Sequence, residues 1–325
     1  EVEREDIPRL DYTDGGCPVL LTEPQSTNLV TNSNDMLASN WSQTTATVTL
    51  SSNLNPSGDS VCYRVEAVGS GRQLGGLATI TNGQTYTSSV YIRRISGSGL
   101  VSMKDINNAN TQVAITDEWQ RYSITGVANS TTGRYYYNLG SDGDVIEVSF
   151  AQLEELSYAT SYMPTYGAIS TRASEIITNS GDVNTFNSEE GVLFAEIAAL
   201  SQDANFQLGL FGTANEQIRF EFQGGVIKAQ LFDGAYQTNM SSGAITLTDN
   251  HKIAFKYKEN DFALWVDGVE VATDTSGNTL SVNELTKLNL TSSTGAAAVV
   301  EAKTSQVQVF NTALSDSELQ ILTTI

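Results

Sequence analysis

Histidine is nearly absent from this chain, and cysteine is also scarce. His251 is the single histidine among 325 residues, and the two cysteines are Cys17 and Cys62. A Ser-His-Asp or Cys-His arrangement would have to use His251, and no Gly-x-Ser-x-Gly elbow accompanies it. Two cysteines in a chain of this length make no disulfide framework, and the sequence leaves open whether they pair. No nucleophilic catalytic site is therefore expected.

Basic residues are few as well, with 17 Lys and Arg against 37 Asp and Glu and a formal charge of −20. Binding to nucleic acid or to an anionic membrane surface needs clustered Lys and Arg, so neither is an expected partner. An acidic chain suits salty or calcium-containing surroundings. No run of 18 or more apolar residues occurs, so we expect no membrane-spanning segment. The chain starts at Glu1 without an initiator Met or an apolar signal segment, which suggests a fragment or a processed product of something longer.

Short alternating runs separated by Ser, Thr, Asn and Gly make up most of the sequence, and this pattern is typical of an all-β sandwich. The clearest example lies between Asn250 and Asp274. Ile253, Phe255 and Tyr257 alternate there with their neighbours, as a half-buried strand requires. A polar turn follows over residues 258–261. Asp267-Gly268 then predicts a tight hairpin, because both central residues must reach positive φ.

Only the last segment is expected to be helical. Ser315 and Glu318 form a capping box, and Leu319 and Leu322 follow at helical spacing. The predicted fold is all-β, with two antiparallel β-sandwich (jelly-roll) domains in series and a short C-terminal helix. We expect an extended arm over residues 1–28, a first module over 29–165 and a second over 166–325. The boundary is placed where Pro164 and Gly167 interrupt the strand pattern. Strands of the first module are expected over 46–50, 61–68, 85–95, 120–126, 134–139 and 145–153.

Several segments resemble known families. The Val266-Asp267-Gly268 hairpin resembles the central hairpins of concanavalin A-like (laminin G-type) lectin sandwiches. Residues 28–32 with Trp41, and the runs 57–67, 83–91 and 118–125, resemble strands of jelly-roll carbohydrate-binding modules. Residues 9–12, 20–29, 150–164 and 171–175 resemble segments of tailed-phage structural proteins of the tail or head-fibre type. Together these resemblances imply a virion surface protein with glycan-binding modules, and the arm would attach it to a larger chain or assembly.

Sandwich folds also carry glycosidases and lyases, so carboxylate pairs were considered. A retaining glycosidase needs two carboxylates about 5 Å apart. Glu196 stands alone on its expected strand, and the same-face neighbours of Glu221 are Arg219 and Gln223. Alginate lyases of this fold use a Gln-Ile-His strand, whereas this chain has Gln217-Ile218-Arg219 and lacks the base. His251 is interpreted as a strand-edge residue without catalytic partners. The sequence therefore predicts a protein that is not an enzyme.

The favoured site is the outward face of a sheet, where aromatic rings stack on sugars and polar groups bond hydroxyls. Residues of the first module that alternate away from the core are the first candidates: Arg64, Glu66, Tyr91, Arg93, Arg121 and Tyr136. In the second module the candidates are Glu196, Arg219, Glu221, Lys228, Gln230, Lys256 and Trp265. If each set shares one sheet it lines a groove, and the alternative is that the residues are scattered over solvated faces. Trp41 and the apolar tyrosines are expected in the core.

The resemblance also implies structural calcium, with Asp35, Asp59, Asp142, Asp144 and Asp274 as candidate oxygen donors. The expected function is non-catalytic binding of host or environmental polysaccharide by a bacteriophage fibre or decoration protein at the virion surface. Other virion proteins and further copies of the chain are expected partners. The alternatives are a purely structural or oligomerisation module of the virion, and an accessory binding region of a secreted polysaccharide-degrading enzyme.

Overall fold

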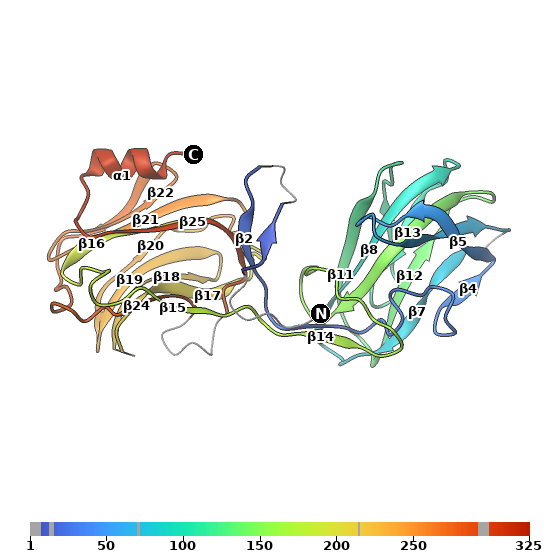
Figure 1. Cartoon of the computed structure of the whole chain (residues 1–325), viewed down its shortest axis with the longest axis horizontal. Helices are drawn as coiled ribbons and strands as arrows, with labels where there is room; N and C mark the ends of the chain where they lie inside the picture. The colour runs from blue at the N-terminus through green and yellow to red at the C-terminus, as the bar shows by residue number, and fades with distance from the viewer. Residues whose placement is uncertain (1–7, 13–15, 70–71, 214, 292–298) are drawn as a thin grey trace. The chain divides into compact units, whose positions relative to one another are not determined.

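The computed structural model describes residues 8–12, 16–69, 72–213, 215–291 and 299–325. The chain divides into two compact units (Figure 1). Residues 25–173 form one, which we call the inserted unit. Residues 174–325 form the other, the flanking unit, together with the described residues up to Pro24. Antiparallel sheets dominate both units and one short helix ends the described chain, so the predicted fold class is confirmed.

Two five-stranded sheets and a two-stranded ribbon build the inserted unit. The first sheet has the order β11 (Gln120–Val127), β8 (Thr85–Ser96), β13 (Val145–Glu154), β6 (Val61–Ala67) and β5 (Ala46–Leu54). The second has the order β10 (Asn110–Val113), β9 (Val101–Lys104), β12 (Thr132–Asn138), β7 (Gln73–Thr79) and β4 (Ser42–Thr44). The ribbon pairs β3 (Ser26–Asn28) with β14 (Ser170–Arg172). The six strands expected in this part of the chain are all present as β5, β6, β8, β11, β12 and β13.

Apolar residues from both five-stranded sheets meet in one core. Val65, Ile92 and Val148 come from the first sheet and Tyr135 and Tyr137 from the second, at alternate positions of their strands. Trp41 is buried among them as expected, with its ring edge-on to Tyr135 at 5.3 Å. The opposite side of each strand is left free to carry polar groups, which is the usual consequence of period-two patterning.

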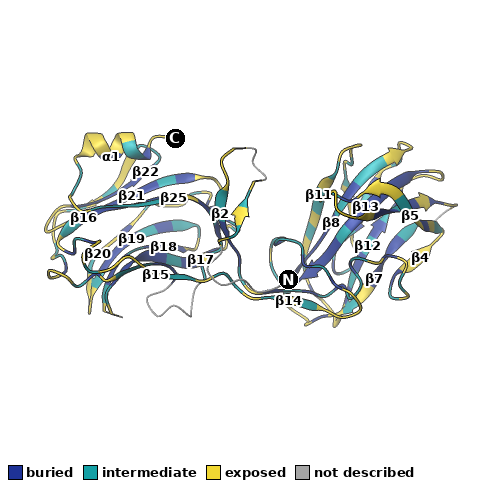
Figure 2. Cartoon of the chain, viewed as in Figure 1, coloured by how far each residue is buried: buried dark blue, intermediate teal, exposed yellow. Residues whose placement is uncertain are grey.

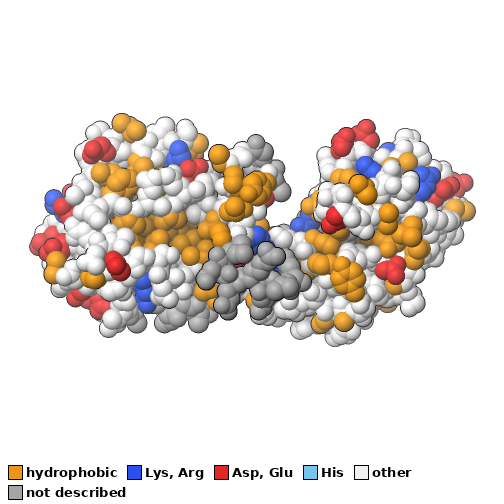
Figure 3. All heavy atoms as spheres, viewed as in Figure 1, with side chains coloured by type: hydrophobic (Ala, Val, Ile, Leu, Met, Phe, Trp, Pro, Cys, Tyr) orange, Lys and Arg blue, Asp and Glu red, His pale blue; other side chains and the backbone are white. Residues whose placement is uncertain are grey.

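The flanking unit is a sandwich of a seven-stranded and a six-stranded sheet. The seven-stranded sheet has the order β1 (Leu10–Asp11), β2 (Val19–Thr22), β25 (Ala302–Phe310), β16 (Glu190–Ala199), β21 (His251–Lys258), β22 (Phe262–Val266) and β23 (Val269–Asp274). The six-stranded sheet has the order β15 (Ile177–Ser180), β24 (Lys287–Leu290), β17 (Asn205–Phe211), β18 (Glu216–Gln223), β19 (Val226–Asp233) and β20 (Tyr236–Ser241). Apolar side chains form a band between these two sheets (Figure 3).

The hairpins predicted between Asn250 and Asp274 are confirmed. β21 pairs with β22, which pairs with β23, so that Ile253 lies opposite Val266. Asp267 and Gly268 have φ of 51° and 81°, the positive values that a two-residue hairpin turn of this kind requires. The inward residues Ile253, Phe255 and Tyr257 are fully buried in the core between the sheets.

Helix α1 (Asp316–Thr323) packs on the outer side of the seven-stranded sheet. The predicted capping box is present, with the Ser315 backbone N–H donating to Glu318 Oε2 at 2.8 Å. Leu319 is fully buried in a second apolar cluster made with Val192, Phe194, Ala254, Ala263 and Trp265. Figure 2 shows the side of the helix away from the sheet as exposed. The helix therefore covers part of a sheet face that the sequence predicted to be open.

Residues 1–7 and 13–15 of the segment predicted as an extended arm lie outside the described residues, and its described part forms β1 and β2 in the flanking unit and β3 in the inserted unit. β2 pairs with β25 through Leu20 and Thr304, and Asp11 forms an ion pair with Lys303 at 2.8 Å. Pairing occurs because an unpaired edge strand such as β25 offers a row of free backbone donors and acceptors. The unit boundary also lies later than expected, at residues 173 and 174, because β14 returns to pair with β3 within the inserted unit.

Candidate functional site

The outer side of the sheet β11-β8-β13-β6-β5 gathers charged and aromatic side chains from four strands. Tyr91 on β8 lies between Arg121 on β11 and Ser149 on β13. One row further, Arg93 on β8 lies opposite Glu147, which lies opposite Arg64 on β6. Val90 and Ile92, at the intervening positions of β8, are buried in the core. We call this outer surface the tyrosine–arginine face.

Among the six residues predicted for this module, the structure brings Arg64, Glu66, Tyr91, Arg93 and Arg121 onto one sheet. Tyr136 does not join them, because it lies on β12 in the other sheet. Its ring lies instead under the Lys104 ammonium, at 5.8 Å. Alternation along a strand shows which side a residue faces relative to its neighbours, but not which sheet the strand joins.

Glu147 holds one end of the tyrosine–arginine face together. It is almost completely buried and accepts hydrogen bonds from Arg93 Nε at 2.8 Å and from Asn53 Nδ2 at 2.8 Å. Burial raises the pKa of Glu147, but the hydrogen bonds from Ser51 and Asn53 and the Arg93 guanidinium outweigh burial and hold the pKa below its usual range. Glu147 is therefore a carboxylate at neutral pH, and Arg93 is engaged within the protein.

Three aromatic residues of this face were missed in the sequence. Phe150 occupies a β-bulge at φ 56°, where its ring is edge-on to Tyr91 at 5.8 Å and stacks on Tyr162 at 4.4 Å. Trp119 lies 4.8 Å from the Arg93 guanidinium and donates from Nε1 to the Leu54 carbonyl oxygen at 3.3 Å. The bulge at Phe150 and the position of Tyr162 beside it depend on tertiary packing, so no local sequence pattern indicates them. Trp119 alone had a signal, since it directly precedes the strand that carries Arg121.

Arg121 is positioned differently from the other arginines of this face. Its Nη2 donates to Ser89 Oγ at 2.9 Å, and its guanidinium carbon lies 5.9 Å from the Tyr91 ring centre. Its Nε is buried without a hydrogen-bond partner. The side chain as a whole is half-buried, so part of it faces solvent.

A second polar surface lies on the outer side of β17, β18, β19 and β20 in the flanking unit. Arg219 Nε donates to Gln230 Oε1 at 2.8 Å, and its Nη1 bonds the amide oxygens of Gln207 and Gln217. The Gln230 amide in turn donates to Asn239 at 3.1 Å. These five residues, Gln207, Gln217, Arg219, Gln230 and Asn239, are the amide face. Predicted residues Arg219, Glu221, Lys228 and Gln230 thus lie on one surface, with Glu221 3.6 Å from Lys228.

The amide face depends on a glycine. Gly209 lies directly opposite Arg219, and a Cβ at Gly209 would lie 2.6 Å from Arg219 Cβ. The missing side chain leaves room for the guanidinium to lie along the sheet among the amides. Phe232 and the exposed Tyr236 contact each other edge-on at 5.2 Å beside this surface.

The other predicted residues of this module are not on the amide face, which corrects the expected groove. Glu196, Lys256 and Trp265 belong to β16, β21 and β22 of the seven-stranded sheet. Trp265 is only 6% exposed beneath α1, and Lys256 pairs with Asp261 at 2.7 Å and Asp316 at 3.4 Å. Lys256 and Trp265 point away from the main core as expected, but the helix that the capping box predicted covers them. Glu196 accepts a hydrogen bond from Asn250 Nδ2 at 3.0 Å.

His251 has two partners that the sequence did not reveal. Its Nδ1 lies 2.6 Å from Asp267 Oδ2, and its Nε2 lies 2.9 Å from the Thr246 carbonyl oxygen. A carbonyl can only accept, so Nε2 carries a proton. The ring ties the start of β21 to the hairpin turn at Asp267. This is a structural role for the residue, and it leaves Nε2 unable to accept a proton from a nucleophile.

Two of the five residues suggested as calcium donors accept hydrogen bonds from backbone N–H groups. Asp144 accepts hydrogen bonds from the backbone of Gly99 at 3.0 Å and Ser141 at 2.7 Å, and Asp142 accepts one from Gly69. Within the described ranges, no three His, Cys, Asp or Glu side chains gather as metal ligands. Cys17 is exposed and Cys62 buried, and both are free thiols.

No helix in the part of the chain that the structure describes is long and apolar enough to cross a membrane.

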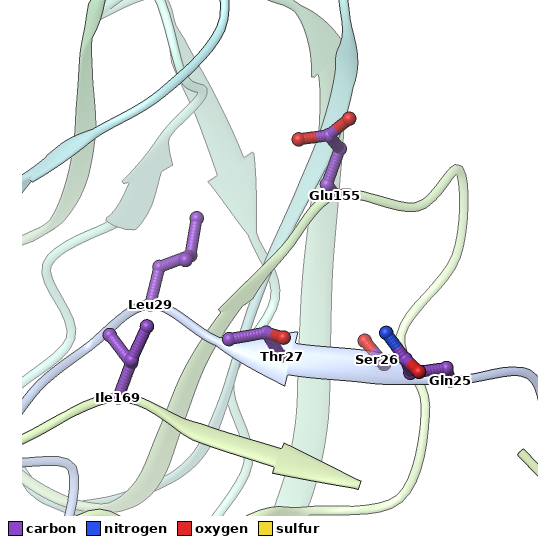
Figure 4. A pocket seen from close by; sticks show the side chains of 6 residues that line it. All are labelled: Gln25, Ser26, Thr27, Leu29, Glu155 and Ile169. Carbon is purple, nitrogen blue, oxygen red and sulfur yellow. The ribbon is translucent and has the colours of Figure 1, made fainter. Parts of the chain in front are cut away.

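A pocket of about 420 Å³ lies beside the ribbon of the inserted unit (Figure 4). It is lined by Gln25, Ser26, Thr27, Leu29, Glu155 and Ile169. Figure 4 shows Leu29 and Ile169 next to each other, as the pairing of Asn28 with Ser170 requires. The Glu155 carboxylate already accepts a hydrogen bond from the Tyr86 hydroxyl at 2.7 Å. None of the predicted site residues lines this pocket, and it brings together no set of groups that suggests a ligand.

Comparison with known proteins agrees with the fold of the flanking unit. Residues 182–320 match the family described as the concanavalin A-like lectin/glucanases superfamily. No curated protein sequence matches the chain.

Similar solved structures include a Ruminococcus gnavus IT-sialidase CBM40 bound to alpha2,3 sialyllactose, with 18% identity and a TM-score of 0.37 over 46% of this chain and 95% of that one. The CBM22-1-CBM22-2 tandem domain of Paenibacillus barcinonensis Xyn10C has 10% identity and a TM-score of 0.31 over 88% and 98%. Domains LG4-5 of the mouse laminin alpha1 chain have 12% identity and a TM-score of 0.28 over 96% of each chain. Residues 182–320 therefore combine this sequence match with two stacked antiparallel sheets.

Proposed function

We propose that this chain is a non-catalytic glycan-binding protein and that the tyrosine–arginine face is its main contact surface. The observation that carries the proposal is the position of Tyr91. Its half-exposed ring lies on the outside of the sheet between Arg121 and Ser149 and is supported edge-on by Phe150. A ring held in this way offers a flat apolar surface to a sugar ring, and the neighbouring guanidinium offers donors to sugar oxygens.

The amide face of the flanking unit is proposed as a second contact surface. Arg219 holds the side-chain oxygen of the half-buried Gln207, and the exposed Asn239 accepts a hydrogen bond from the buried Gln230. The exposed side chains of Asn239 and Tyr236 beside Arg219 offer polar and aromatic contacts to a ligand rich in hydroxyl groups. The residues lie within the segment that matches the lectin/glucanase superfamily. Two weak sites on one chain would strengthen attachment to a repeating polymer.

Two features support the non-catalytic part of the proposal. His251 Nε2 is bonded to a backbone carbonyl, so it does not activate a nucleophile. Glu196 and Glu221, the carboxylates considered for glycoside hydrolysis, lie on different sheets of the sandwich. A retaining or inverting pair must flank one glycosidic bond, which these two do not.

The proposed setting is the surface of a bacteriophage virion, where the chain acts as a fibre or decoration protein and attaches to host or environmental polysaccharide. This part of the proposal rests on the phage-like segments at residues 9–12, 20–29, 150–164 and 171–175. Capsid and tail genes beside the coding gene would support it. Neighbouring genes for secreted polysaccharide hydrolases would favour an accessory role in a degrading enzyme instead.

A glycan array with matched tyrosine variants tests the binding function. We expect Tyr91→Ala to weaken binding about tenfold, because roughly 1.4 kcal/mol of stacking and apolar contact is lost. Tyr136→Ala is the control, since Tyr136 is also a half-exposed tyrosine beside a cation but lies on the other sheet. Equal losses in both variants would reject the face, and no binding to any glycan would favour a purely structural role. Release of oligosaccharides would contradict the non-catalytic assignment.

A further inference from the structure

Among the described residues of the tyrosine–arginine face, Arg121 is the one cation without a carboxylate partner. Arg93 is held by Glu147 at 2.6 Å, and Arg64 lies 3.8 Å from Glu66. Among the described residues, no carboxylate oxygen lies within 4.0 Å of the Arg121 guanidinium. The chain carries 37 acidic residues against 17 basic ones, so acidic partners are not scarce. An unneutralised, half-buried arginine in such a chain needs an explanation.

The surroundings of Arg121 hold its guanidinium in place without satisfying it. Ser89 Oγ accepts from Nη2 at 2.9 Å, and the Tyr91 ring lies 5.9 Å from the guanidinium carbon. Nε is buried without an acceptor, and no described residue accepts a hydrogen bond from Nη1. Buried donors in folded proteins nearly always find a partner, so a buried donor without one marks a place where an acceptor can bind. Arg121 is thus held beside Tyr91, while its Nε and Nη1 groups have no acceptor among the described residues.

We propose that Arg121 binds the carboxylate of an acidic sugar whose ring packs on Tyr91. This inference names the ligand class of the proposed glycan-binding site and rests on that proposed function. A carboxylate accepts two parallel hydrogen bonds from a guanidinium, which is a stronger and more specific contact than a sugar hydroxyl makes. The overall negative charge does not prevent it, because repulsion is screened beyond about 8 Å at physiological ionic strength, whereas Arg121 acts at contact distance.

The test uses ligands that differ only in the carboxylate. Polysaccharides containing uronic or sialic acids are immobilised beside their carboxyl-reduced forms, and binding of the full chain is measured to each. We expect the wild-type chain to prefer an acidic form over its reduced partner by about tenfold. Arg121→Gln should remove that preference. Arg134→Gln should retain it, because Arg134 is a half-buried arginine on β12 of the other sheet.

Arg121→Lys separates charge from geometry. It keeps the positive charge but lacks the planar fork, so its preference for the acidic form should lie between those of the wild-type chain and Arg121→Gln. Thermal unfolding of each variant is recorded, since Ser89 loses its donor. If Arg121→Gln fails to fold, the wild-type preference and the Arg121→Lys result decide the question.

The outcomes separate this inference from the proposed function. Equal binding to acidic and reduced forms that still depends on Tyr91 would overturn the acidic-sugar assignment and leave glycan binding in place. A preference for acidic forms that survives Arg121→Gln would also overturn it. Failure of the wild-type chain to bind any polysaccharide would remove the proposed function and this inference together.

Discussion

Trp265 offers a sharp test, because it was expected to contact ligand and the structure buries it beneath α1. The ring is 6% exposed and packs with Phe194, Ala254 and Leu319. Truncating a buried Trp to Ala destabilises a protein by about 3–5 kcal/mol. For a unit of 150–250 residues each kcal/mol shifts Tm by about 2–4 °C. Trp265→Ala should therefore lower the melting temperature of the flanking unit by about 6–20 °C.

A phenylalanine variant sharpens this expectation. Trp265 Nε1 is buried and has no hydrogen-bond partner, and an unsatisfied buried donor is unfavourable by about 1–3 kcal/mol. Trp265→Phe removes that donor and keeps most of the apolar contact. We therefore expect it to change the free energy of unfolding by less than about 1.5 kcal/mol. We therefore expect the wild-type chain and Trp265→Phe to have similar stability, and Trp265→Ala to be much less stable than either.

Scanning calorimetry is the suitable assay, because two compact units can give separate transitions and a single Tm would be ill-defined. Only the transition of the flanking unit should move. Trp119→Ala is the control, since Trp119 is a half-buried tryptophan of the inserted unit. Glycan binding by Trp265→Ala at a temperature where it remains folded should equal that of the wild-type chain. Unchanged stability with lost binding would refute the assignment of Trp265 to a packed cluster.

Three further predictions follow from the ion pairs and from the first strands. The folded-state pKa of Glu147 is lowered, so its contribution to stability is present above its unfolded pKa of about 4.3 and is lost as pH falls through the folded value. Glu147→Gln should flatten the acid limb of a stability–pH curve, and an unchanged limb would argue against the Arg93 pair. Burial by itself would lower the pKa of Lys256, but the carboxylates of Asp261 and Asp316 have the larger effect, and the folded-state pKa is raised. The stabilisation that Lys256 provides is therefore present below its unfolded pKa of about 10.4 and is lost as pH rises through the folded-state pKa. Lys256→Met should remove this alkaline loss in urea unfolding curves, whereas Lys258→Met, in a more exposed pair, should leave it. Deleting residues 1–24 removes β1 and β2 with the buried Leu21, which should destabilise the flanking unit by at least about 2 kcal/mol. A calorimetric transition that does not move on this deletion would show that the segment is dispensable.

Local patterns predicted most of the secondary structure correctly. The alternation around Ile253, the Asp267-Gly268 turn and the Ser315–Glu318 capping box each depend on residues within a few positions of one another. Such features are encoded where they occur, because φ preferences, side-chain direction and capping act over one or two turns of chain.

The pairing of distant strands was not accessible in the same way. β2 was predicted as part of an arm because nothing near Val19–Thr22 indicates that β25, more than 250 residues later, presents a free edge. The same limit applies to the candidate site. Tyr91 and Tyr136 both alternate outward from a core strand, yet the strand order places them on opposite sheets.

The sequence by itself determined the fold class, the hairpins, the terminal helix and the side of its strand on which each candidate residue lies. These properties follow from period-two alternation and from turn and cap chemistry, which are local. Only the tertiary structure decided which outward residues share a surface and which are covered. It gathered Arg64, Tyr91, Arg93 and Arg121 beside Glu147, and it placed α1 over Lys256 and Trp265. The physical reason is that strand order and the docking of the helix depend on the whole buried surface, which no single segment contains.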